Sequence, residues 1–151
     1  MHQRTLVTIG IALFLGLAAA TAQPEAPPTR FGLYLNQRLY PQSTARGALS
    51  SVLSAIDRGR VDYVLAQLTD PAFVDERVRR VYAGDFHGLV AEASLKLADN
   101  PAAIALLARF LKEGDWQENE GTATARLKDV PDRQVYLSRV GTRWYLENRQ
   151  R

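Results

Sequence analysis

The sequence predicts an α+β domain in which N-terminal helices pack on a C-terminal antiparallel β-meander of about four strands. From Ser43 to Glu113, apolar residues recur with the spacing of amphipathic helices. From Asp115 to Asn148, apolar and polar residues alternate with the period of two that marks strands, and short turns separate the runs. A helical layer followed by such a meander places the helices on one face of the sheet.

The first 22 residues have the features of a secretory signal peptide. Arg4 supplies a basic start, an apolar run follows from Leu6 to Leu17, and Ala20-Thr21-Ala22 is a small-x-small cleavage site. An uncleaved anchor is the alternative, but the run is short for a membrane span, which needs roughly 17–25 residues. We expect export to the periplasm or the exterior, with cleavage near Ala22 and no membrane association afterwards.

Composition narrows the chemistry that the chain can perform. It contains no cysteine, so an exported domain of this sequence must be held by its core, and thiol redox chemistry and Cys-based metal sites are excluded. Cleavage after Ala22 removes Arg4 from the 19 Lys and Arg residues and none of the 16 acidic residues, which leaves a formal charge of +2. Charges of both signs are interspersed, and we expect no nucleic-acid partner.

Residues 23–42 are expected to form a Pro-rich linker followed by an apolar arm, ahead of a single domain over 43–151. The linker, up to Arg30, has the composition of an extended segment. The arm, Phe31 to Tyr40, is rich in aromatic and leucine residues. Because exposed apolar patches of this size are uncommon, we expect the arm to pack along the domain. A docking segment for a protein partner is the alternative.

The first two helices are predicted from caps and breakers. Ser43 or Thr44 can cap the first helix, whose apolar residues share one face, and Gly59 ends it. A shorter helix is expected over Val61–Leu68, and Asp70-Pro71 ends it.

Three further helices are predicted before the sheet. One spans about 71–82 with Pro71 in its first turn, and Asp85 caps the next. The last begins at Pro101 and is closed by Gly114. It is apolar nearly all round, so we expect it to be the most buried helix.

The meander is predicted from turns. Asn119-Glu120-Gly121, Asp129–Asp132 and Gly141-Thr142 separate a strand at Trp116, a strand over Thr122–Leu127, a strand over Gln134–Val140 and a final strand over Arg143–Asn148. The period of two places one set of apolar residues toward the helices: Trp116, Val135, Leu137, Trp144 and Leu146.

Two segments carry a resemblance to a known fold family. Ala48–Val64, with the sequence ALSSVLSAIDRGRVDYV, resembles the opening helix pair of NTF2-like (cystatin-like α+β) domains, and Gly141–Leu146, GTRWYL, resembles the final strand of small exported members. The resemblance implies a curved sheet wrapped around helices and enclosing a conical pocket. Enzymes, ligand binders and structural modules share this fold, so the fold does not settle the function.

No catalytic set or metal-ligand spacing is present, and we expect no cofactor and no metal site. His87 is the only histidine after residue 22, and we expect it to be a surface residue. The pair Asp75-Glu76 could supply a pocket carboxylate, but a solvated first-turn pair is favoured. The basic cluster Arg77, Arg79 and Arg80 is expected to be a solvated face.

Aromatic residues are the remaining candidates for a site. We expect most of them in the core, with some lining the pocket if it is open. The candidates are Tyr63, Phe73, Tyr82, Trp116, Tyr136 and Trp144. The sequence favours a non-enzymatic binding or interaction module for a small ligand or a protein partner. The alternative is a hydrolase or isomerase that uses a pocket carboxylate.

Overall fold

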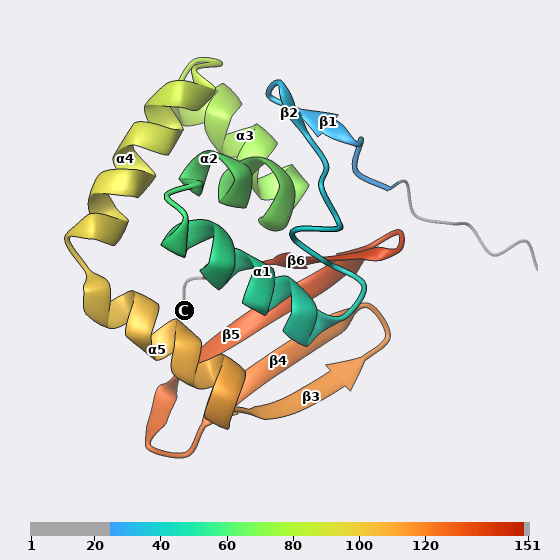
Figure 1. Ribbon diagram of the computed structural model, residues 1–151, viewed down its shortest axis with the longest axis vertical. Helices are drawn as coiled ribbons and strands as arrows, with labels where there is room; N and C mark the ends of the chain where they lie inside the picture. The colour runs from blue at the N-terminus through green and yellow to red at the C-terminus, as the bar shows by residue number, and fades with distance from the viewer. Residues whose placement is uncertain (1–24, 150–151) are drawn as a thin grey trace, which may run out of the picture.

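The computed structural model describes residues 25–149, which form a layer of helices over an antiparallel sheet (Figure 1). The helices are α1 (Ala45–Asp57), α2 (Val61–Tyr63), the π-helix η1 (Val64–Leu68), α3 (Pro71–Val81), α4 (Phe86–Ala98) and α5 (Pro101–Glu113). The predicted α+β class is therefore confirmed. The expected signal peptide lies outside the described residues.

Short polar side chains start most of the helices. Thr44, Asp85 and Asn100 cap α1, α4 and α5, and each accepts a hydrogen bond from the amide group three residues later. Asp70 caps α3 in a similar way, with Pro71 in the first turn, where a missing amide hydrogen costs nothing. The helix expected over 71–82 is thus present and begins where Pro71 predicts.

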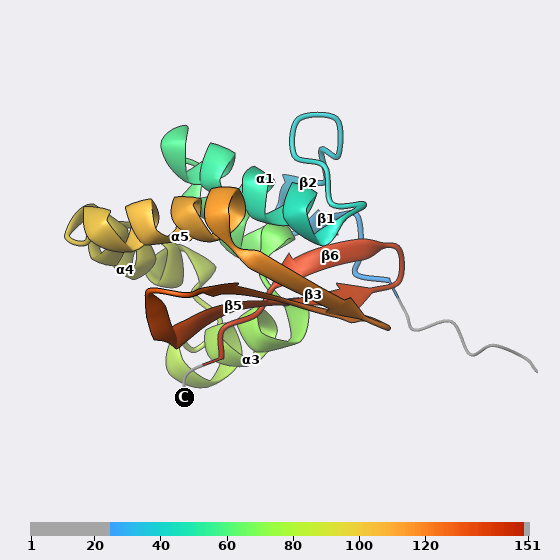
Figure 2. The ribbon, with the colours of Figure 1, turned by 90° about the horizontal axis from the view of Figure 1, so that it is seen from below.

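The sheet is a meander whose strands pair in chain order (Figure 1), and α1 and α5 lie on one side of it (Figure 2). Its strands are β3 (Asp115–Asn119), β4 (Thr122–Leu127), β5 (Val130–Val140) and β6 (Arg143–Leu146). Two predicted bounds were wrong: β5 begins at Val130, not at Gln134, and β6 ends at Leu146, not at Asn148. A register shift between Arg126 and Leu127 accommodates Pro131, which is tolerated at such irregularities because no ladder hydrogen bond is lost there.

The sheet face predicted to point toward the helices does so. The register pairs Trp116 with Ala125, Ala125 with Val135, and Leu137 with Leu146, and directly paired residues share a face. Trp144 lies on the same face because it is two residues from Leu146. All five expected residues belong to the main core cluster or pack against it, together with residues of α1 and α5.

The prediction that α5 is the most buried helix was wrong. Only Phe110 of α5 is buried, whereas α1 buries residues along most of its length. Helix α1 lies at the centre of the layer and contacts β6, α5 and η1, while α5 and α4 form its outer side (Figure 1). Leu106, Leu107 and Leu111 of α5 are only partly buried against the main core cluster.

In the structure the end of the linker is continuous with the arm, so the arm means residues 25–40 from here on, and two buried arginines, Arg30 and Arg143, fasten it to the domain. Its strands β1 (Thr29–Arg30) and β2 (Leu33–Tyr34) form a hairpin. Arg30 donates to the carbonyl oxygens of Ala66 and Pro71 and to the Asp75 carboxylate. The apolar segment expected to pack along the domain does so, since Leu33 packs against one core cluster and Tyr40 is buried in another, although Tyr34 remains 79% exposed.

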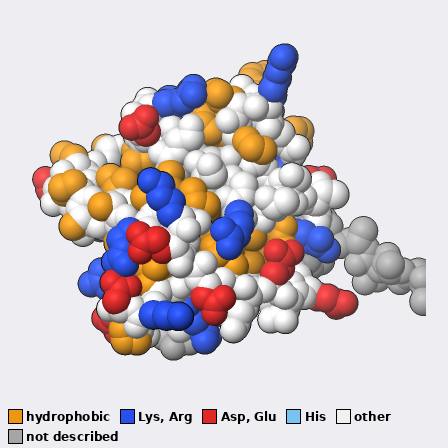
Figure 3. Space-filling view, turned by 60° about the horizontal axis from the view of Figure 1, so that its bottom comes forward, with side chains coloured by type: hydrophobic (Ala, Val, Ile, Leu, Met, Phe, Trp, Pro, Cys, Tyr) orange, Lys and Arg blue, Asp and Glu red, His pale blue; other side chains and the backbone are white. Residues whose placement is uncertain are grey.

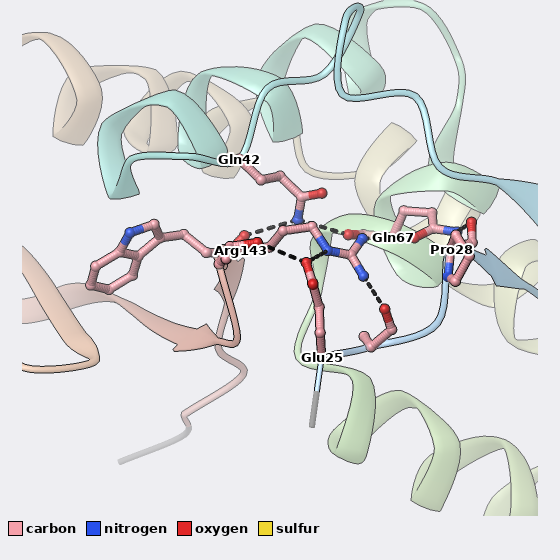
Figure 4. A network of polar contacts seen from close by, with 8 residues as sticks. Glu25, Pro28, Gln42, Gln67 and Arg143 are labelled. Carbon is pink, nitrogen blue, oxygen red and sulfur yellow. Dashed lines mark hydrogen bonds and ion pairs between the residues drawn. The ribbon is translucent and has the colours of Figure 1, made fainter. Parts of the chain in front are cut away.

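Arg143 of β6 holds the beginning of the arm (Figure 4). Its side chain is 2% exposed and donates to the Glu25 carboxylate at 3.1 Å and to the carbonyl oxygen of Ala26. Gln67 of η1 lies beside it and donates to the carbonyl oxygens of Pro28 and Leu33. The arm, η1 and β6 therefore share one polar network.

The outer edge of β6 is covered instead of being open to other chains. Gln42 donates from its side chain to the carbonyl oxygen of Trp144 and accepts from the Trp144 amide through its own carbonyl. Further along, the amide of Asp70 donates to the carbonyl oxygen of Leu146. Covered edges limit unwanted strand pairing.

Candidate functional site: a groove beside helix α4

A groove runs along α4, between the helices and the end of β6. One part, which we name the apolar cavity, has a volume of about 320 Å³ and is lined by side chains of α1, η1, α3, α4, α5 and β6, among them Ile56, Leu65, Phe73, Ala93, Leu97 and Leu107. The adjoining part, which we name the polar mouth, has a volume of about 270 Å³. The two parts share Leu65, Phe73, Ala93, Lys96 and Asn148, so they form one groove.

The π-helix η1 contributes one wall of the apolar cavity. Val64 and Leu65 line the cavity, and the Thr69 hydroxyl donates to the carbonyl oxygen of Val64 at 2.9 Å. This bond satisfies the side chain of Thr69, which also lines the cavity, so its hydroxyl is not a free polar group there. Short π-helical turns are rare and frequently lie at functional sites.

The polar mouth is built around the carboxylate of Glu92. The Tyr82 hydroxyl and the Lys96 ammonium both donate to it. Lys96 lies one helical turn after Glu92 on α4, and Tyr82 follows the end of α3. Arg77 of α3 also lines the mouth and brings a second positive charge.

These contacts shift the ionisation of the mouth. The hydrogen bond from Lys96, followed by that from Tyr82, lowers the pKa of Glu92, and the charge of Arg77 acts in the same direction. The hydrogen bond to Glu92 raises the pKa of Tyr82, since it favours the protonated phenol. At neutral pH the mouth therefore holds one carboxylate, two cations and one neutral phenol.

A second hollow, of about 390 Å³, lies on the other side of Leu107. It is lined by the apolar side of α5 and by residues 132–134 and Tyr136 of β5, together with Arg149. Arg149 lies over the Tyr136 ring at 4.7 Å and pairs with Glu147, a residue that lines the apolar cavity. The segment 147–149 therefore borders both hollows.

The aromatic candidates fall into three places. Phe73 and Tyr82 line the groove and Tyr136 lines the second hollow. Tyr63 and Trp144 are buried in the core, at 3% and 2% exposure. Trp116 is partly buried and packs against the main core cluster.

The candidate carboxylates and the histidine lie away from the groove. Asp75 pairs with Arg30 of the arm, and Glu76 pairs with Arg80 on the exposed side of α3. His87 is exposed, at the start of α4. Sequence analysis did not single out Glu92 and Lys96; their spacing of four residues was the available signal.

A further hollow, of about 580 Å³, is lined by Asp75, Arg79 and Phe31, but it is wide open, and its carboxylate is already paired with Arg30. The charged surface gives no other candidate. Lys and Arg side chains are interspersed with Asp and Glu over the face drawn in Figure 3. Within residues 25–149, no group of three or more His, Asp or Glu side chains could hold a metal ion. None of the helices described in that range has both the length and the apolar character needed to cross a bilayer.

The fold and the groove define a class: an α+β domain with an open groove that is apolar in one part and polar in the adjoining part. Comparisons of the chain with protein-family models, with curated proteins and with solved structures found no match.

Proposed function

We propose that this chain is an exported, non-enzymatic binding module of the NTF2-like type, which holds a small apolar ligand in the cavity beside α4. The observation that carries the proposal is the continuous groove with two adjoining parts, an apolar one of about 320 Å³ and a more polar one of about 270 Å³. Small-molecule sites have this character and occupy about 300–1,000 Å³. The signal-peptide features of residues 1–22 support export.

The NTF2-like assignment draws support from the arrangement of the layers. Helices cover one face of an antiparallel sheet, and hollows open between the sheet, α5 and the segment that follows β6. This arrangement is compatible with the pocket of that family. The assignment bears on function because it implies a ligand pocket between the sheet and the helices.

A catalytic carboxylate is less well supported. Glu92 and Glu147 are the acidic residues that line the groove among residues 25–149. A general base works best with a pKa near the operating pH, and the pKa of Glu92 is shifted the other way, below its ordinary value. Glu147 is paired with Arg149. We therefore favour binding over hydrolysis or isomerisation.

The test is binding of 1-decanol, an uncharged probe, followed by amide chemical shifts in a two-dimensional NMR titration. We expect shifts that saturate and that cluster at residues lining the apolar cavity. Ala93→Trp fills the cavity from α4 and should abolish this binding, since Ala93 lines both parts of the groove. Ala91→Trp makes the same change on the exposed side of α4 and is the matched control.

Two results would contradict the proposal. The first is the absence of saturable shifts in the wild-type protein. The second is equal binding by wild type and Ala93→Trp, provided that the variant keeps the wild-type dispersion of amide signals.

A further inference from the structure

The side chain of Glu92 occupies a site that is built for a carboxylate. Its oxygens accept from the Lys96 ammonium and the Tyr82 hydroxyl, and Arg77 lies on the same polar mouth. Ammonium and guanidinium groups form strong, charge-assisted bonds with carboxylates, and the phenol adds a neutral donor. The mouth therefore already holds one carboxylate, supplied by the chain itself.

The charge of the mouth leaves room for a second anion. Arg77 and Lys96 carry two positive charges against the single negative charge of Glu92. The side chains of Lys96 and Glu92 are 69% and 43% exposed, so both can move toward solvent without unfolding the helix. An incoming anion would be attracted by the two cations and would meet the charge of Glu92, while the other carboxylate of the groove, Glu147, is paired with Arg149.

The position of Lys96 links this charge to the apolar cavity. Lys96 lines both the cavity and the mouth, so its stem borders the apolar part while its ammonium lies at the polar part. Asn148 lies at the same junction and offers an uncharged amide. A ligand whose apolar body fills the cavity would place its end group beside these side chains.

We propose that the ligand of this groove is an amphiphilic carboxylate, with its apolar chain in the cavity beside α4 and its head group at Lys96 and Arg77. This inference rests on the proposed binding function and adds the head group to it. A cationic amphiphile is disfavoured, because its head would meet the excess positive charge. An alcohol of the same chain length would make the apolar contacts in the cavity but would lack the electrostatic attraction to Lys96 and Arg77.

The experiment compares decanoate with 1-decanol, which have chains of equal length, by the same NMR titration at low ionic strength. We expect decanoate to bind several-fold more tightly than decanol, and the difference to shrink as salt is added. Lys96→Gln should weaken decanoate binding roughly two- to fivefold, the effect of an exposed ion pair. Decanol binding should not change.

Glu92→Gln is the more decisive variant. If Glu92 had only a structural role, its replacement would weaken decanoate binding, whereas the head-group inference predicts tighter binding. Removal of its charge frees Lys96 and Tyr82 for the ligand, so decanoate should bind roughly two- to fivefold more tightly, with decanol unchanged. Lys112→Gln and Glu76→Gln are matched controls, on exposed positions of α5 and α3 outside the groove.

Each outcome separates the two proposals. If neither probe binds, the proposed function fails and the head-group inference fails with it. If both bind with equal affinity, and Lys96→Gln and Glu92→Gln change nothing, the carboxylate inference is overturned while the binding function stands. If Lys112→Gln weakens decanoate binding as much as Lys96→Gln does, net charge explains the effect and the inference is overturned too.

Discussion

Replacement of Arg143 by methionine should loosen the arm and lower the stability of the whole domain. The guanidinium is 2% exposed and joins β6 to Glu25 and Ala26 at the beginning of the arm. Methionine keeps an unbranched apolar stem but cannot donate a hydrogen bond. The substitution therefore tests the polar network more than the packing.

The expected loss follows from the partners that Arg143 leaves behind. Its contact with Gln67, at 3.5 Å, is too long to contribute much. Glu25 is 45% exposed, so its ion pair contributes about 0.2–1 kcal/mol. The carbonyl oxygen of Ala26 is only partly buried, so the loss of its donor costs about 1–2 kcal/mol, the lower part of the range for buried groups. We expect the free energy of unfolding to fall by about 1–3 kcal/mol.

Urea denaturation followed by tryptophan fluorescence measures this loss, with Glu25→Gln as the companion variant. Glu25→Gln removes only the ion pair and should cost at most about 1 kcal/mol. Arg143→Met should also expose the linker to limited proteolysis at native conditions, because residues 25–28 lose their anchor. A loss below about 0.5 kcal/mol, or an equal loss in both variants, would refute the reasoning.

Three further predictions use the same denaturation assay. Trp144→Ala should cost about 3–5 kcal/mol, since the indole is 2% exposed in the core, and a loss under about 1 kcal/mol would contradict its placement. Burial raises the pKa of Tyr145 to about 12, so the protein should lose stability as pH rises from about 10, the ordinary value, through about 12. The variant Tyr145→Phe has no phenol to ionise and should not show this alkaline loss of stability. At neutral pH its free energy of unfolding should be about 0.5–1 kcal/mol higher than that of wild type, because the buried Tyr145 hydroxyl has no hydrogen bond among the described residues. The hydrogen bond from Arg60 lowers the pKa of Asp62, so the advantage of wild type over Asp62→Asn should be present above about pH 3.9 and vanish as pH falls through the lower folded pKa. If the difference in stability between wild type and Asp62→Asn did not change with pH in this range, the ion pair between Arg60 and Asp62 would not stabilise the fold.

Local signals in the sequence were sufficient for most of the helices and strands. Thr44, Asp85 and Pro71 mark helix starts through interactions within a few residues, and these starts were predicted. The inward set of the sheet followed from the alternation of side chains along each strand, because a period of two assigns faces without knowledge of the partner. Helix caps and strand alternation both depend on residues close together in the sequence, so they can be recognised without knowledge of the fold.

Contacts between distant residues could not be predicted in the same way. Arg143 lies in a strand between turn residues and Trp144, where a polar side chain is expected to face water. Its burial depends on the arm, more than 100 residues earlier in the chain. The exposure of α5 was missed for the same reason, since composition shows that a helix is apolar but not which neighbours are available to cover it.

The groove could not be predicted from composition alone, because it depends on how the helices pack in three dimensions. Leu65 and Ala93 belong to ordinary apolar faces, and nothing in their spacing separates a residue that fills the core from one that borders a cavity. The aromatic candidates show the same limit. Phe73 and Trp144 were grouped together from the sequence, yet one lines the groove and the other is buried.

The bond between Arg143 and Ala26 also sets an order of events in folding. A chain that emerges from its N-terminus presents the arm first, and the residue that receives it appears 117 positions later. Arg30 can bind η1 and α3 earlier, but the Glu25–Ala26 end of the arm cannot dock until the final hairpin is available. Contacts so far apart in sequence form slowly, because a long loop must close before they contribute. Early in synthesis this end of the arm therefore remains undocked, and it is fastened only when the sheet is completed.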